Sequence, residues 1–386
     1  GRANRRRIDG EALRSLAEAA RRVRLQKERP QQTALLLNSF AKLRYARDAA
    51  LFGKLFGLAK KTLPAWDSQA LALLCNAFAS VEAEARARIR PGGWEAIAER
   101  CSEVVFGADG QHLACMAHAL VRVDAPSSEV AVFYEVLEDV LCQRAQINDL
   151  FSSQDIALIA HGLALHRRSC ETFKAVDEGP LTKWPFEEYA ARRLRSLTPQ
   201  GLTTVLVASI HLRRGGLELF IALATALRRY HGKFSGKGFV STCRAALDAS
   251  PVVGLPAVLD FLRDLQPDCN RLMPNLLAYE LTGLGRILAT AAVARQKQGC
   301  SSQLWRSPDE VEAFLGGLCA RASELLDARG EAARKRIRAH AALVAKAEGV
   351  HWNAHADETQ DENEAETVLA AAAALVGADT AAKMNQ

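Results

Sequence analysis

The sequence predicts an all-α protein built as an α-solenoid, in which helical hairpins stack side by side. Two observations, composition and a repeat, support this fold class, and a third argues against a membrane-spanning segment. Apolar residues make up 49% of the chain while aromatic residues make up only 6%, and alanine and leucine dominate, which favours helices over strands. No apolar run is long enough to cross a bilayer; the nearest, 370–376, is far too short. A helical motif recurs about every forty residues, and such a period is typical of a repeat architecture.

The repeat is visible as seven units spaced by 37 to 47 residues. We place their first residues at Gln31, Gln69, Gln111, Gln154, Gly201, Gly238 and Asn275. Eight residues later each unit carries a small residue: Ser39, Ala77, Ala119, Gly162, Ser209, Ala246 and Gly283. A large apolar residue follows at once: Phe40, Phe78, Leu120, Leu163, Ile210, Leu247 and Leu284. The small residue would allow a neighbouring helix to approach closely, and the large one would fill the groove between helices.

Each unit reads as a hairpin, because a second amphipathic helix follows the first. Examples are "DAALFGKLFGLAKKTL" and "WEAIAERCSEVVF", whose apolar residues recur at intervals of three and four. Glycine and proline punctuate the connections, as at 91–93 and 215–216. Such hairpins cannot bury their apolar faces alone, so we expect them to stack into a solenoid with one long concave surface.

The ends of the chain differ from the repeats. Residues 1–29, with ten basic and four acidic side chains, predict a basic arm and helix, and 30–300 are the solenoid. An extra helix is expected in the long connection at 171–197. Residues 301–352 predict a helical cap with a basic helix, and 353–386 an acidic linker followed by an alanine-rich helix.

We find no constellation of residues that predicts catalysis, and we expect no enzyme activity, cofactor or metal site. The nine cysteines form no C-x-x-C pair, which indicates free thiols in a reducing compartment. "SGKGF" at 235–239 lacks the rest of a nucleotide-binding loop, so a turn before a helix is favoured; "HWNAH" at 351–355 lacks the glutamate of a zinc-protease helix. Polar residues recur just before the small residue of the first four units, and we expect them to bond the turn between repeats: Asn38, Asn76, His118 and His161.

Charge is the main functional signal. The net charge is +6, but the last 34 residues hold seven acids and one lysine, so the preceding 352 carry +12. Basic residues recur just past the small and large pair, and a row of cations at repeat spacing would suit a nucleic-acid backbone. Lysine and arginine also favour helix C-termini for purely structural reasons. The RNA-binding candidates are Arg5, Arg6, Arg7, Lys42, Arg44, Arg122, Arg167, Arg168, Arg213, Arg214, Arg228, Arg229, Arg286, Arg334, Lys335 and Arg336.

The repeat resembles a known family. "QQTALLLNSFAKLRYARDAALFGKLFGLA" at 31–59 is similar to the heptatricopeptide-type helical repeats of organellar RNA-binding proteins, which accompany RAP domains and FAST-kinase-like proteins in apicomplexan and algal organelles. "SQALALLCNAFASV" and "SQDIALIAHGLALHR" match in part. The resemblance covers about 31–290. No RAP domain follows, which argues against a nuclease-like role.

Two functions remain open. The resemblance implies a non-catalytic RNA-binding scaffold in the mitochondrial matrix, with a plastid as the alternative. On this hypothesis the chain is a mitochondrial ribosome subunit that clasps ribosomal RNA, has neighbouring proteins as further partners, and does not span a membrane. The alternative is a protein-only scaffold subunit of a large organellar complex. Cations lining one continuous surface would favour RNA, whereas acidic or exposed apolar residues there would favour a protein partner.

Overall fold

The structure is a computed structural model, and its regular secondary structure is entirely helical. It describes residues 10–22, 30–43, 48–80, 93–122, 127–145, 151–171, 182–324, 328–350, 367–368 and 370–371. Over these residues there are 18 α-helices, three short 3-10 helices and no strand, which confirms the predicted all-α solenoid. The chain divides into two compact units, an N-terminal unit ending at Phe186 and a C-terminal unit beginning at Glu187.

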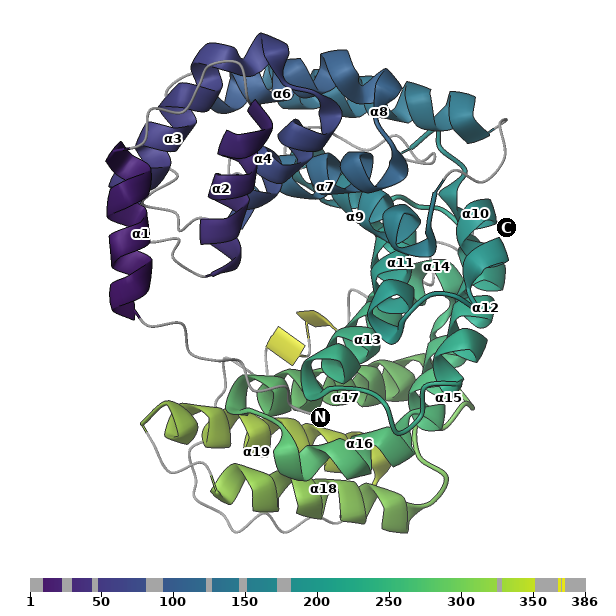
Figure 1. Cartoon of the computed structure of the whole chain (residues 1–386). Coiled ribbons are helices and arrows are strands. Elements are labelled where there is room, and N and C mark those ends of the chain that lie inside the picture. Colours follow the sequence, from purple (N-terminus) through teal and green to yellow (C-terminus); the bar gives the residue numbers. More distant parts are fainter. Residues whose placement is uncertain are drawn as a thin grey trace. The chain divides into compact units, whose positions relative to one another are not determined.

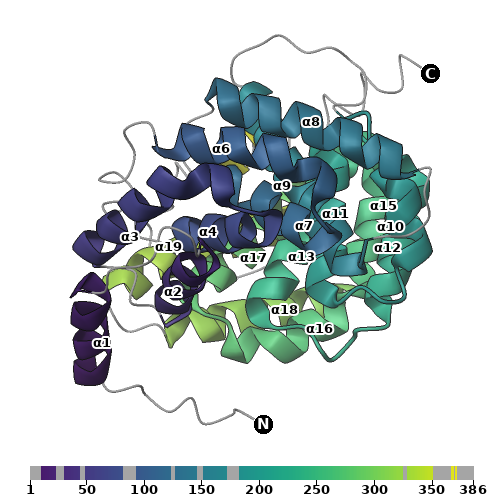
Figure 2. The same cartoon turned by 45° about the horizontal axis from the view of Figure 1, so that its top comes forward.

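The N-terminal unit consists of two layers of helices (Figures 1 and 2). The first helices of successive hairpins pack one on the next: α2 (Pro30–Lys42), α4 (Ser68–Ser80), α7 (Gly110–Leu120) and α9 (Ser153–Glu171). The second helices form the other layer, in which the basic N-terminal helix is the first member: α1 (Gly10–Arg22), α3 (Ala49–Thr62), α6 (Gly93–Val104) and α8 (Ser128–Ala145). Short 3-10 helices at Leu63–Ala65 and Val105–Gly107 end α3 and α6.

The C-terminal unit repeats this scheme with longer helices towards its end. Its first layer is α11 (Pro199–His211), α13 (Gly236–Asp248), α17 (Ala278–Gln298) and α19 (Ala328–Glu348), each packed on the one before. The remaining helices are α12 (Gly216–Arg228), α14 (Ser250–Val253), α15 (Leu255–Asp264), α16 (Gln266–Leu272), a 3-10 helix (Met273–Asn275) and α18 (Pro308–Ser323). The extra helix predicted within 171–197 is α10 (Phe186–Arg193).

Side-chain caps fix where the first helices begin. The carboxylates of Asp67 and Asp109 accept the backbone N–H three residues on, each at 2.8 Å. The hydroxyls of Ser152, Thr198 and Ser235 do the same before α9, α11 and α13. These side chains satisfy N–H groups that have no partner inside the helix. The "SGKGF" stretch is therefore a capped helix start, as expected.

The caps correct the repeat register that the sequence suggested. In the second, third and fourth units the opening glutamine lies two residues after the cap. The same rule places the fifth and sixth openings at Gln200 and Lys237, one residue earlier than predicted. Asn275 is wrong as the seventh opening, because it lies in a 3-10 helix and α17 begins after Leu277, which makes Tyr279 the equivalent residue.

The small and large pair behaves as predicted where the register was right. Phe78, Leu120 and Leu163 are fully buried. Gly162 lies so close to α7 that a Cβ atom there would be 2.9 Å from the carbonyl carbon and oxygen of Ala117. Ser39 departs from the pattern, since it is exposed at the first helix of the array.

Candidate nucleic-acid interface

The first helices of the N-terminal unit share a solvent-facing side, which we call the first-helix face. We count the residues four, seven, eight, eleven and fourteen positions after each opening glutamine, and keep those that are exposed or half-buried. The face then consists of Leu35, Ser39, Lys42, Leu73, Asn76, Ser80, Cys115, His118, Arg122, Leu158, His161, Leu165 and Arg168. These intervals bring residues to one side of a helix at 3.6 residues per turn. Because α2, α4, α7 and α9 pack in sequence, their faces form one surface.

Polar residues at one repeat position are paired with each other from helix to helix. The Asn76 side-chain amide donates to the Oδ1 atom of Asn38 at 2.9 Å, and the His118 and His161 rings stack with centroids 5.8 Å apart. About two helical turns earlier, at the opening position of the repeat, the Gln31 amide donates to the Oε1 atom of Gln69 at 3.0 Å. For the asparagines, the predicted bond to the inter-repeat turn was thus wrong, because the equivalent residue of the next repeat lies closer. Burial and the nearby Arg122 lower the pKa of His118, so its ring is neutral at pH 7.

Acidic side chains are scarce on the first helices. α2, α4 and α7 contain none and α9 contains two, whereas in the other layer α6 and α8 contain seven and α3 contains none. On the first-helix face, as described, the charged residues are Lys42, Arg122 and Arg168, all three basic and exposed. This side of the unit therefore carries positive charge with no opposing carboxylate among its members.

Other predicted cations are held by carboxylates of the protein itself. Arg167 lies 3.2 Å from Glu138, a buried residue of α8, and Arg214 lies 3.1 Å from Glu187. Arg228 is paired with Asp264. A buried carboxylate such as that of Glu138 needs its partner, so these pairs have a structural role that sequence spacing does not reveal.

The remaining predicted residues occupy different surroundings. Arg213 follows α11 with a left-handed φ of 52°, and the Arg229 guanidinium donates to the carbonyl of Leu194 at 3.1 Å. Lys335 and Arg336 are exposed on α19. Arg5, Arg6, Arg7, Arg44 and the side chain of Arg334 lie outside the described residues.

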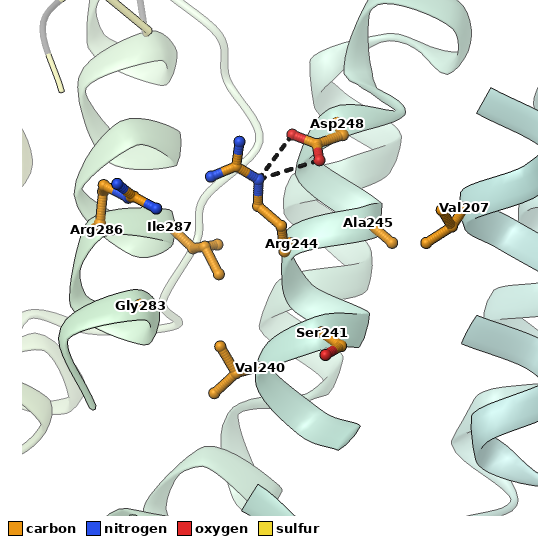
Figure 3. Close-up of a pocket in the computed structure, with 9 residues that line it drawn as sticks. All are labelled: Val207, Val240, Ser241, Arg244, Ala245, Asp248, Gly283, Arg286 and Ile287. Carbon is orange, nitrogen blue, oxygen red and sulfur yellow. Dashed lines mark hydrogen bonds and ion pairs between the residues drawn. The ribbon is translucent and has the colours of Figure 1, made fainter. Parts of the chain in front are cut away.

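Arg286 was predicted at the end of a first helix but lies in the middle of α17, which continues to Gln298. In the corrected register it is at position seven, equivalent to His161. With Arg244 of α13 it lines a groove of about 480 Å³ formed by α11, α13 and α17 (Figure 3). Arg244 was absent from the predicted set because it precedes the small and large pair of its unit, Ala246 and Leu247.

The sequence analysis also missed a repeated structural arginine. Near the end of a second helix, an arginine donates to the backbone carbonyl of a loop 34 to 45 residues earlier. Arg100 bonds Trp66 at 3.0 Å, Arg144 bonds Phe106 and Ala108 at 2.7 and 2.6 Å, and Arg321 bonds Leu276 at 3.2 Å. Arg229 and Arg271 make the equivalent bond. The regular spacing of these arginines was the available signal.

Within the described ranges, no group of three or more histidine, cysteine or acidic residues is arranged to hold a metal ion. Each cysteine described there with its side chain is a free thiol. Cys75 and Cys101 are buried with their Sγ atoms 3.8 Å apart, and this hydrogen bond together with burial raises the pKa of the Cys75 thiol. His351 and His355 lie outside the described residues. No described helix is both long enough and apolar enough to span a bilayer.

No protein-family profile matches the chain, and no curated protein matches it. Among solved structures, a "circular tandem repeat protein with novel repeat topology and enhanced subunit contact surfaces" is similar at 14% identity, covering 96% of this chain and 97% of that one, with a TM-score of 0.31. At this level the likeness supports no argument about function.

Proposed function

We propose that the chain is a non-catalytic RNA-binding scaffold, and that RNA lies along the first-helix face. The observation that carries the proposal is the charge of this face, whose described charged residues are all basic. Lys42 and Arg168 are exposed near the ends of α2 and α9, and Arg122 is exposed just after α7, while α6 and α8 of the other layer contain seven acidic residues. Cations that share one face suit a polymer of phosphates.

The mode of binding follows from the kinds of residue on this face. The described members of this face include no Phe, Tyr or Trp, so the proposed mode does not depend on base stacking. Arginine, lysine, asparagine and histidine side chains can contact phosphate and ribose. We therefore propose recognition of the backbone and shape of a folded RNA.

The resemblance of residues 31–59 to organellar RNA-binding repeats supports a more specific role. On this basis we propose a subunit of a mitochondrial ribosome in the matrix, with ribosomal RNA and neighbouring proteins as partners, and a plastid as the alternative compartment. The net charge of +12 over the first 352 residues suits a component of a large ribonucleoprotein.

One observation favours a protein partner instead. Leu35 is 50% exposed on the same face, beside the polar row. Three further leucines of this face are half-buried: Leu73, Leu158 and Leu165. A protein-only scaffold would bind a partner helix through such apolar residues. This second candidate makes the opposite prediction about salt, because apolar contacts do not release counterions.

The test compares two triple variants with the same change of charge. Lys42→Gln, Arg122→Gln and Arg168→Gln neutralise the first-helix face, and the control neutralises three exposed lysines of α3: Lys54, Lys60 and Lys61. RNA affinity is measured by fluorescence anisotropy between about 50 and 200 mM salt. If each face residue contacts one phosphate of a single strand, the slope of log K against log salt falls by about two for the face variant. Equal affinities and slopes for the two variants would refute binding on this face.

Arg167 and Arg214 are left unchanged in this design. Replacing either would leave Glu138 or Glu187 without its cation, so lost binding would be confused with lost stability.

A further inference from the structure

The groove between α13 and α17 in the C-terminal unit combines two arginines with an apolar wall. It is lined by Arg244, Asp248 and Ser241 from α13 and by Arg286 and Gly283 from α17. Its apolar wall comes from Val207, Val240, Ala245 and Ile287. Figure 3 shows the guanidinium groups of Arg244 and Arg286 extending into the groove from the two helices.

Asp248 orients Arg244 without using all of its donors. Both carboxylate oxygens of Asp248 lie 3.0 Å from the Nε atom of Arg244, one helical turn earlier on α13. A guanidinium has five N–H donors, so the four on the terminal nitrogens are not committed to Asp248. In Figure 3 these terminal nitrogens are on the side of the guanidinium away from Asp248.

Arg286 has a donor that needs an acceptor. Its Nε atom is buried and has no hydrogen-bond partner among the described residues. A buried N–H without an acceptor is unfavourable, most of all on a charged group. The two arginines and Asp248 leave the groove with a net charge of +1, so an anion would satisfy both the donor and the charge.

The groove has room for an anion attached to a larger group, and Gly283 lets α17 approach α13 closely at its base. Gly283 has no side chain, and a Cβ atom there would lie 3.3 Å from the Cγ1 atom of Val240. The volume of about 480 Å³ exceeds what a single phosphate needs. The apolar wall is suited to the sugar that a phosphodiester carries.

We infer that this groove binds one phosphate group through Arg244 and Arg286, and that in the RNA complex it holds a phosphate of the RNA backbone. The inference rests on the proposed function for the source of the phosphate, but not for the chemistry of the site. A free phosphate is the other source of the same ligand, and the experiment separates the two.

The variants change the groove in two independent ways. Arg244→Gln and Arg286→Gln remove charge, while Gly283→Leu fills the groove with no change in charge. Arg306→Gln is the matched control, because Arg306 is an exposed arginine of the same unit that does not line the groove. Helicity and Tm are recorded for each variant; if Arg286→Gln unfolds, Gly283→Leu and Arg244→Gln still test the site, and Arg286→Lys should retain part of the binding.

Two probes are used with the full chain: a labelled RNA oligonucleotide in anisotropy titrations and inorganic phosphate followed by 31P line broadening. The inference predicts that each groove variant weakens RNA binding about tenfold and lowers the salt slope by about 0.7, while Arg306→Gln changes neither. If the groove variants and Arg306→Gln all bind RNA as tightly as the wild type does, the inference is overturned and the proposed function stands. If the wild type does not bind RNA but broadens the 31P line of inorganic phosphate, and Gly283→Leu abolishes this broadening, the anion site stands and the proposed function fails. Binding of neither probe overturns both.

Discussion

Replacing Gly162 with alanine tests the packing of the repeats most sharply. A Cβ atom at this position would lie 2.9 Å from the carbonyl carbon and oxygen of Ala117 and 3.1 Å from its Cβ atom. Two of these are backbone atoms of the neighbouring helix and the third is the Cβ of an alanine, so no flexible side chain can move aside. Overpacking of this kind costs about 1–3 kcal/mol, and better helix propensity returns about 1 kcal/mol. With a backbone clash we expect a net loss of about 1–2 kcal/mol.

Gly57→Ala is the matched control. Gly57 is also within a helix, α3, but a Cβ atom there would meet nothing within 4 Å. The same substitution should therefore stabilise by about 0.5–1 kcal/mol through helix propensity alone. The two variants differ only in whether a neighbouring helix is close.

The assay is hydrogen exchange read on α7 and α9, together with urea unfolding followed by circular dichroism. Repeat arrays can unfold in parts, so a local measurement is needed beside the global one. Gly162→Ala should speed exchange in α7 and α9, and Gly57→Ala should slow exchange in α3. If the Gly162→Ala variant has the same free energy of unfolding as the Gly57→Ala variant, the close approach of α9 to α7 is refuted.

Three further predictions follow from named contacts. Arg144→Gln removes two hydrogen bonds to the carbonyls of Phe106 and Ala108 and should lower the free energy of unfolding in urea by about 1–3 kcal/mol. The control Arg168→Gln, on the exposed face, should change it by less than about 0.5 kcal/mol. Equal effects would contradict the role given to Arg144. Burial, with a smaller effect of Arg167, lowers the pKa of His166 to about 4, below its unfolded value of about 6.5. The unfolded state then binds more protons between these values, so stability is full above about pH 6.5 and falls by at most about 3 kcal/mol as pH drops to about 4. His166→Phe, which keeps a ring stacked on Tyr134, should remove this part of the pH dependence, and an unchanged profile would count against the assignment. Asn76→Leu removes the hydrogen bond to Asn38 and should leave Asn38 without that partner, so hydrogen exchange in α2 and α4 should become faster. Unchanged hydrogen exchange would show that the pair contributes nothing to stability.

The sequence predicted the fold well because the repeat is written in local patterns. Amphipathic spacing and caps such as Asp67 and Asp109 specify helices without long-range information. The register failed in the last three units: the fifth opens at Gln200, one residue before the predicted Gly201, while Lys237 and Tyr279 carry no recognisable signal. The cap of Ser235 was present in the sequence and would have corrected the sixth unit.

The site was harder to predict because a cation alone does not reveal its partner. Arg167 and Arg168 are adjacent in sequence, yet one pairs with the buried Glu138 and the other is exposed. Which of the two faces Glu138 depends on the packing of α9 against the second-helix layer. Arg244 was missed for the same reason, since its relation to Arg286 exists only across two packed helices.

The central claim is that RNA lies on the first-helix face, and ultraviolet crosslinking tests it most directly. The native protein is crosslinked in isolated organelles, the attached RNA is sequenced, and the crosslinked peptides are identified by mass spectrometry. The proposal predicts reads concentrated on ribosomal RNA and crosslinked peptides from α2, α4, α7 and α9. Reads on messenger RNA would keep the face and change the role. RNA at background level, or crosslinks confined to α3, α6 and α8, would contradict the claim.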